Sequence, residues 1–151
     1  IYYNTKKVFW ENEMFEIIKQ SVKHFFGEIL RCKITPSKSI KGELYGSAIA
    51  LTHKNEEINF YLFFPKEVFE RYRDIFLKGA VLKEDDWCDL SKEFANEIIG
   101  YAKIKLNERN EEFKLGIPEY LGRVDFNDFK LDKEAIFSDG KFSFRIGYKK
   151  R

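Results

Sequence analysis

Residues 89–100 have the sequence DLSKEFANEIIG, in which apolar and polar positions recur with the period of an α-helix. At about 100° per residue, Glu93 and Asn96 project from one face, a turn apart, and Gly100 follows one turn further along. The apolar residues of this segment lie on the other side (Leu90, Phe94 and Ile98). The sequence therefore predicts a helix that packs through its apolar face and presents a polar strip to the outside.

The polar strip, formed by Asp89, Glu93, Asn96 and Gly100, carries few bulky side chains. A glycine within a helix costs roughly 1 kcal/mol relative to alanine, and asparagine is a weak helix former. Together they leave a flat surface on which the backbone of another protein could approach a carboxylate and an amide. Most polar helix faces are simply solvated, so a solvated surface is the alternative interpretation of the strip.

Apolar spacing elsewhere predicts further helices and several strands. Helical spacing covers residues 10–26, with Gly27 as a stop signal, and residues 65–76, where Pro65 suits the first turn. The helix that carries the strip is expected over about 87–107. Alternating apolar residues predict strands over 30–35, 44–52, 58–64, 113–117 and 142–148, with turns at 53–56 and 138–141. This order predicts one α+β domain over residues 1–151, with helices packed on a largely antiparallel sheet.

The composition agrees with a single compact core. Of the 151 residues, 44% are apolar, 34% are charged and 17% are aromatic. The longest apolar run, residues 60–64, is far shorter than the roughly 20 residues that span a bilayer. The formal net charge is +2 and no basic stripe stands out. We therefore expect neither a membrane span nor a nucleic-acid partner.

The cysteine and histidine residues offer no site for a metal or cofactor. Cys32 and Cys88 are isolated thiols, so a reducing cytoplasm is the expected location. His24 and His53 have no partners at metal-ligand spacing, and we expect His24 to play an ordinary structural or surface role. Phosphate-loop and nucleophile-elbow motifs are absent. The chain begins with Ile1 rather than Met, so we expect residues upstream of it, and a leader or a further domain there stays open.

The spacing Asp89-xxx-Glu93-xx-Asn96-xxx-Gly100 resembles the (Asp/Ser)xxxExxN motif of the CheC/CheX/FliY chemotaxis phosphatases, in which a glycine often follows at this distance. The order of the predicted elements and the stretch FKLGIP at 113–118 are also similar to CheX, so the resemblance covers about residues 11–148. The motif occurs once, as in single-site CheX rather than two-site CheC and FliY. A CheC/CheX-like fold is therefore expected.

The resemblance implies a hydrolase: an aspartyl-phosphate protein phosphatase that acts on a phosphorylated CheY-type response regulator in bacterial chemotaxis, a two-component signalling system. Glu93 would pair with a lysine of the regulator, and Asn96 would orient the attacking water. Mg²⁺ would be held by the regulator, and the phosphatase would be a homodimer. The expected partner contacts are Asp89, Glu97, Gly100 and Lys103, with Asp89 at the rim or capping the helix.

Two departures from the family pattern keep other functions open. Glu97 follows Asn96 where relatives usually have an apolar residue, and Ser91-Lys92 replaces small residues just before Glu93. One alternative is therefore a non-catalytic module that binds a response regulator or acts within a flagellar switch. A further alternative is an unrelated α+β structural domain that binds no regulator.

Overall fold

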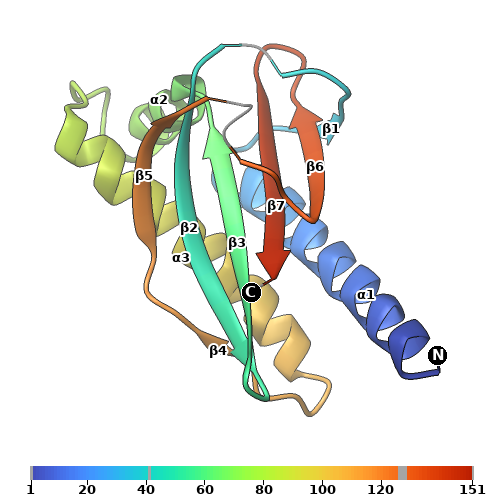
Figure 1. The fold of residues 1–151 in the computed structure, drawn as a ribbon. Coiled ribbons are helices and arrows are strands. Elements are labelled where there is room, and N and C mark those ends of the chain that lie inside the picture. The colour runs from blue at the N-terminus through green and yellow to red at the C-terminus, as the bar shows by residue number, and fades with distance from the viewer. Residues whose placement is uncertain (1, 41, 126–128, 151) are drawn as a thin grey trace.

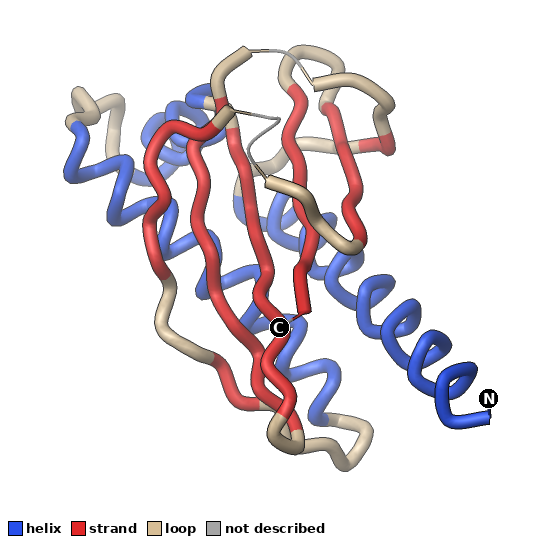
Figure 2. Tube along the Cα trace, in the orientation of Figure 1, coloured by secondary structure: helices blue, strands red, loops and turns tan. Residues whose placement is uncertain are grey.

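The computed structural model describes residues 2–40, 42–125 and 129–150, and describes the backbone alone for residues 2–10. Within these residues, seven strands form one antiparallel sheet, and the helices cover one of its faces (Figures 1 and 2). The helical elements are α1 (Tyr2–His24), the π-helical turn η1 (Phe25–Ile29), α2 (Lys66–Phe76) and α3 (Glu84–Asn107). The strands are β1 (Thr35–Pro36), β2 (Leu44–His53), β3 (Glu56–Phe64), β4 (Lys114–Leu115), β5 (Glu119–Val124), β6 (Lys133–Ser138) and β7 (Ser143–Lys150). The expected α+β class is confirmed.

The hairpin of β2 and β3 lies within the sheet, whose order is β1-β6-β7-β3-β2, with β4 and β5 both pairing with β2. Its turn residues Lys54 and Asn55 have φ angles of 49° and 67°, as the tight turns that suit the twist of a two-stranded hairpin require. The register runs from Tyr45 opposite Phe64 to His53 opposite Glu56. The hairpin predicted from the sequence is therefore confirmed.

An aromatic core joins the helices to the sheet. Phe26, from η1, is fully buried and stacks on Phe144 of β7 with ring centroids 4.4 Å apart. Phe94, from α3, contacts Phe25 at 5.2 Å and Phe64 of β3 at 6.1 Å. Because these rings come from both ends of the chain, the helices take their positions from long-range packing.

The first helix differs from its predicted bounds. It begins near Tyr2 rather than at residue 10 and continues through His24 into η1, so Gly27 lies inside the π-helical turn and does not stop the helix. The backbone N–H of Leu30 donates to the carbonyl of Phe25 at 3.2 Å, which widens the last turn by one residue. The sequence also predicts that Phe9 and Trp10 pack over the sheet, but their side chains lie outside the described residues.

The strand predicted over 30–35 is wrong. Leu30 and Ile34 are buried as the alternation indicated, but Arg31 has a φ of 54°, which breaks an extended strand. The backbone N–H of Cys32 donates to the carbonyl of Phe26 at 2.8 Å and is therefore used by the helix end. Only Thr35 and Pro36 pair, with β6.

Two strands were not predicted. β5 lies at an edge of the sheet, its side chains are exposed or half-buried, and Gly122 has a φ of 75° beside a register shift in β2. β6 carries Glu134, which pairs with Arg145 of β7 at 2.5 Å. Neither segment has the clean apolar alternation of a half-buried strand. The strand predicted over 113–117 is shorter than expected, since only Lys114 and Leu115 pair with β2.

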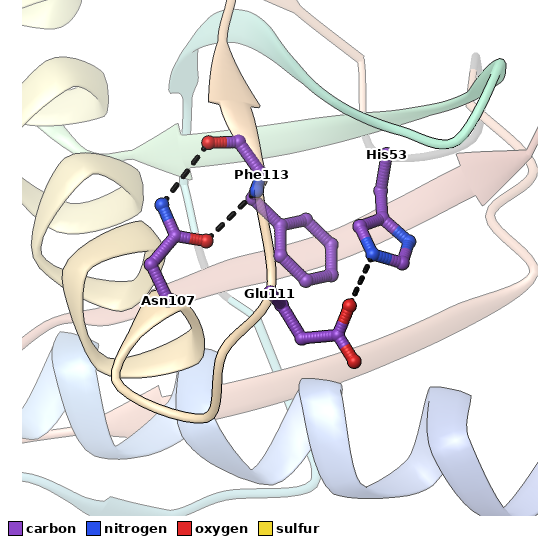
Figure 3. Close-up of polar contacts among 4 residues, drawn as sticks. All are labelled: His53, Asn107, Glu111 and Phe113. Atoms are coloured by element: carbon purple, nitrogen blue, oxygen red, sulfur yellow. Dashed lines mark hydrogen bonds and ion pairs between the residues drawn. The ribbon is translucent and has the colours of Figure 1, made fainter.

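The C-terminal end of α3 is tied to β4 by a side-chain clamp (Figure 3). The amide oxygen of Asn107 accepts the backbone N–H of Phe113 at 2.8 Å, and its amide nitrogen donates to the carbonyl of Phe113 at 3.2 Å. His53 stacks on the Phe113 ring at 4.3 Å, and its Nε2 lies 2.5 Å from Glu111 Oε2. The clamp fixes where α3 ends relative to the β2–β3 hairpin.

Candidate functional site

Helix α3 packs on the sheet through its inner face, and this packing fixes the position of the polar strip. Its inner face is buried over several turns (Phe94, Ala95, Ile98, Ile99 and Ala102). On α1, the buried hydroxyl of Ser21 donates to the carbonyl of Ile98 and joins the two helices at the level of the strip. The outward face carries Glu93 and Glu97, both exposed, and Asn96 and Gly100, both half-buried. The predicted orientation of the helix is confirmed.

The strip is flanked by side chains from other elements. On α2, the half-buried Tyr72 packs on Phe94 with ring centroids 5.3 Å apart and on Phe76 at 4.7 Å. At the end of α1, the His24 ring stacks almost parallel on Tyr101, at 4.2 Å and 9°. On the sheet side, a Cβ built on Gly100 would lie 3.6 Å from Leu115 Cδ2. The sequence predicts a helix over 65–76 but gives no signal that Tyr72 would lie beside the strip, since this position depends on how the two helices pack.

A groove of about 400 Å³ runs between α3 and the end of α1. Its walls come from α3 (Asn96, Glu97, Gly100, Tyr101, Lys103 and Ile104) and from α1 and η1 (Ser21, His24, Phe25 and Ile29). Four of the six residues singled out in the sequence therefore line one groove, namely Asn96, Glu97, Gly100 and Lys103. Glu93 and Asp89 lie outside the groove lining, toward the N-terminal half of the helix.

Asp89 does not cap α3. The helix begins at Glu84, so Asp89 lies in its second turn and is exposed. The capping carboxylate is that of Asp86, which accepts the backbone N–H of Lys83 at 2.8 Å. The expectation of a cap at Asp89 is wrong because it assumed a helix that starts at residue 87.

Glu93 and Glu97 lie four residues apart on the outward face of α3, so their carboxyl groups form an i, i+4 pair of like charge. Although the Glu97 side chain is largely exposed, partial desolvation of its carboxyl raises its pKa, and the nearby charge of Glu93 raises this pKa further. Burial, followed by the charges of Glu97 and Glu93, also raises the pKa of the Tyr72 phenol. The carboxyl pair of Glu93 and Glu97 therefore lies near the phenol of Tyr72.

The polar groups of the strip are carboxyls and one amide. Among the residues that the structure describes, no group of three or more His, Cys, Asp or Glu side chains could hold a metal ion. Across the same residues, no helix is long and apolar enough to cross a bilayer. What the strip offers is an amide able to donate and accept hydrogen bonds, next to carboxylates that could pair with a cation.

Comparison with solved structures identifies the fold, whereas the sequence matches no protein-family model and no curated protein. CheX from Vibrio vulnificus superposes with a TM-score of 0.76 at 15% identity, over 92% of this chain and 97% of that chain. The fold is that of CheX. A CheC-like protein from Shewanella oneidensis MR-1 gives a TM-score of 0.70 at 17% identity, over 90% of this chain and 96% of that chain.

A third solved structure with this CheX-like fold comes from a complex. CheX in the CheX–CheY–BeF₃–Mg²⁺ complex from Borrelia burgdorferi gives a TM-score of 0.69 at 15% identity, over 90% of this chain and 97% of that chain. At these identities the comparison establishes the fold, and this confirms the CheX-like architecture expected from the motif spacing and the element order.

Proposed function

We propose that this CheX-like domain hydrolyses the aspartyl phosphate of a CheY-type response regulator. The observation that carries the proposal is the placement of Glu93, Asn96 and Gly100 on the outward face of α3, beside a groove, on a CheX-like fold. The Borrelia burgdorferi complex supports the choice of partner, because in it a CheX is bound to CheY with BeF₃ and Mg²⁺. The reaction would take place in the cytoplasm, where response regulators act.

The chemistry requires little from the domain. An acyl phosphate has a good carboxylate leaving group, and Mg²⁺ on the regulator would balance the phosphoryl charge. What remains is to hold a water molecule in line with the phosphorus, which the Asn96 amide can do with one donor and one acceptor. Glu93 would pair with a lysine of the regulator and set the depth at which Asn96 enters. Neither role requires a metal bound to the domain.

Two substitutions test these roles, because one should reduce hydrolysis and the other should reduce binding. The domain is mixed with a panel of purified CheY-type regulators, phosphorylated in the presence of Mg²⁺, and phosphate release is followed. Asn96→Ala should lower the hydrolysis rate by about 100-fold or more while leaving affinity nearly unchanged, because a misplaced water loses its in-line geometry. Glu93→Ala should weaken binding by roughly 2–5 kcal/mol if its charge pair is buried in the complex.

Matched control variants lie on α1, away from the strip. Asn12 and Glu16 are both exposed, so Asn12→Ala and Glu16→Ala should leave binding and hydrolysis unchanged. If Asn96→Ala kept full phosphatase activity, the catalytic assignment would be wrong.

A second candidate function is a module that binds the regulator without hydrolysing its phosphate. The observation in its favour is Glu97, which directly follows Asn96 on α3 and adds a second exposed carboxylate beside Glu93. In the same assay this function predicts regulator binding with no phosphate release above the regulator's own rate.

The assembly we propose is a homodimer, with two strips in each particle. Light scattering coupled to size-exclusion chromatography measures the mass of the assembly, and a monomeric mass at assay concentrations would contradict the homodimer.

Elemental analysis of the purified domain should find no stoichiometric transition metal, because Mg²⁺ is expected to enter with the regulator.

A further inference from the structure

The groove beside the strip has apolar walls as well as polar ones. Its apolar and aromatic side chains come from η1 (Phe25 and Ile29) and from α3 (Tyr101 and Ile104). The hydroxyl of Ser21, which also lines the groove, already donates to the carbonyl of Ile98. A group that enters between η1 and α3 would therefore bury carbon surface, and this burial would favour its binding.

The walls of the groove are held in place by ring contacts within the domain. The ring of Tyr101 stacks on that of His24, with centroids 4.2 Å apart and planes 9° from parallel. Phe25 is buried and packs on Phe94 with ring centroids 5.2 Å apart. Because these side chains are already ordered in the free domain, binding would not have to supply the free energy needed to order them.

Ile104 has the most exposed side chain of the four apolar walls, at 57%. It follows Gly100 by four residues, so the two lie on the same face of α3, one turn apart. Along the helix axis it lies about 12 Å from Asn96, at 1.5 Å per residue. A partner that covers Asn96 and Gly100 with an interface of about 800 Å² would therefore reach Ile104 as well.

The size and the position of the groove indicate what could occupy it. Its volume of about 400 Å³ is near the lower end of the roughly 300–1,000 Å³ of typical ligand sites, which leaves room for a large side chain but not for a helix. Asn96, which would orient water at the phosphate of the regulator, is a wall of the same groove. The protein that carries this phosphate is therefore the partner whose surface would lie over the groove.

We propose that the groove receives a large apolar side chain that the response regulator exposes beside its phosphorylated aspartate, and that Ile104 contacts this side chain. This inference rests on the proposed function. It divides recognition between two kinds of contact, since Glu93 would pair with a charged group of the regulator and the groove would accept an apolar one. A regulator with a polar side chain at that place would bind less tightly, because the polar group would lose water without gaining a partner.

The experiment measures KM and kcat with the regulator that the phosphatase assay selects. We expect Ile104→Ser to raise KM roughly tenfold, the lower end of what burial of a large apolar side chain contributes, while kcat stays unchanged because Ile104 does not touch the reacting atoms. Ile104→Leu should restore most of this loss, since it keeps the apolar volume. Val81→Ser is the matched control, because Val81 is 82% exposed and lies in the connector before α3.

Two further measurements are specific to an apolar contact. The effect of Ile104→Ser should be the same at low and at high salt, whereas the effect of Glu93→Ala should shrink as salt is raised. On the regulator, each large apolar side chain exposed beside the active site is replaced in turn by serine. One of these regulator variants should raise KM for the wild-type domain but not for Ile104→Ser, because both substitutions remove the same contact.

The outcomes distinguish failure of this inference from failure of the proposed function. Hydrolysis by the wild type with the same KM in Ile104→Ser would overturn the contact at Ile104 and leave the phosphatase intact. A lower kcat with unchanged KM would also overturn it, as would regulator variants whose effects all add to that of Ile104→Ser. If the wild type neither binds nor hydrolyses any regulator of the panel, the proposed function fails and this inference fails with it.

Discussion

The fold leaves space for a side chain at Gly100. A Cβ at this position would meet only Leu115 Cδ2, at an ordinary contact distance of 3.6 Å. Gly100→Ala should therefore raise the free energy of unfolding by up to about 1 kcal/mol, the difference in helix propensity. It should also weaken regulator binding, because it adds a methyl group to a residue that lines the groove. Chemical denaturation and a binding titration measure the two effects.

A matched glycine gives the opposite result for stability. A Cβ on Gly147 of β7 would lie 2.5 Å from the Lys133 carbonyl oxygen, so Gly147→Ala should destabilise the domain strongly. If Gly100→Ala were equally destabilising, Gly100 would serve packing rather than access to the groove.

The carboxyl pair also affects the stability of the free domain. The folded-state pKa of Glu97 is raised, so its contribution is fully present at acidic pH and is lost as the pH rises through that raised pKa. Glu97→Gln should therefore stabilise the domain at pH 7 by about 0.5 kcal/mol, the size of a repulsive i, i+4 pair. The gain should vanish near pH 4, which urea denaturation at both pH values measures. A gain that is the same at both pH values would contradict the repulsion.

Only the part of the site that lies on α3 could be predicted from the sequence. The spacing of Glu93, Asn96 and Gly100 places them on a common face because helical geometry depends on sequence separation alone. Tyr72 and His24 come from α2 and α1, and their approach to the strip depends on how the helices pack. No local pattern in the sequence contains that information.

Among the elements, η1 places two buried phenylalanines, Phe25 and Phe26, in the core. Phe26 is fully buried and stacks on Phe144, so Phe26→Ala should cost roughly 3–5 kcal/mol of unfolding free energy. Phe76 at the end of α2 is 48% exposed and serves as the control, for which a much smaller loss is expected. A loss below about 1 kcal/mol for Phe26→Ala in chemical denaturation would show that the packing around η1 is wrong.

The elements found from the sequence are those whose sequence pattern is regular over neighbouring residues. Helices α2 and α3 and the hairpin of β2 and β3 have regular apolar periods and clear turn residues such as Asn55. Strands β5 and β6 have mixed side chains and exist because a neighbouring strand supplies their hydrogen bonds. In the segment after η1, buried residues alternate as in a strand, but the positive φ of Arg31 prevents the backbone from forming one.

At the scale of the whole molecule, the helices share one face of a sheet to which both halves of the chain contribute (Figure 1). The stack of Phe26 on Phe144 joins residues far apart in the sequence, and Phe94 connects α3 to β3. The orientation of the strip relative to the rest of the domain therefore depends on long-range packing. The sequence predicts the antiparallel class of the sheet but not its strand order.

Helix α3 also has an uneven distribution of charge along its length. Its first turn carries Glu84, Asp85 and Asp86, and Glu93 and Glu97 follow. The groove end carries Lys103, and Lys105 lies in the last turn. Such a gradient orients a charged partner before contact, since an approach with the opposite polarity brings like charges together.

This gradient acts on the encounter rather than on the bound complex. The first turn lies about 10–14 Å from Glu93 along the helix, at 1.5 Å per residue. Its charges act over this distance at 0.01 M salt, where the Debye length is about 30 Å, and are screened at physiological salt, where it is about 8 Å. In stopped-flow mixing, the association rate constant should fall as salt is raised, and Asp85→Lys should slow association at low salt while kcat is unchanged. An association rate that did not respond to salt would mean that the regulator finds this helix by unguided diffusion.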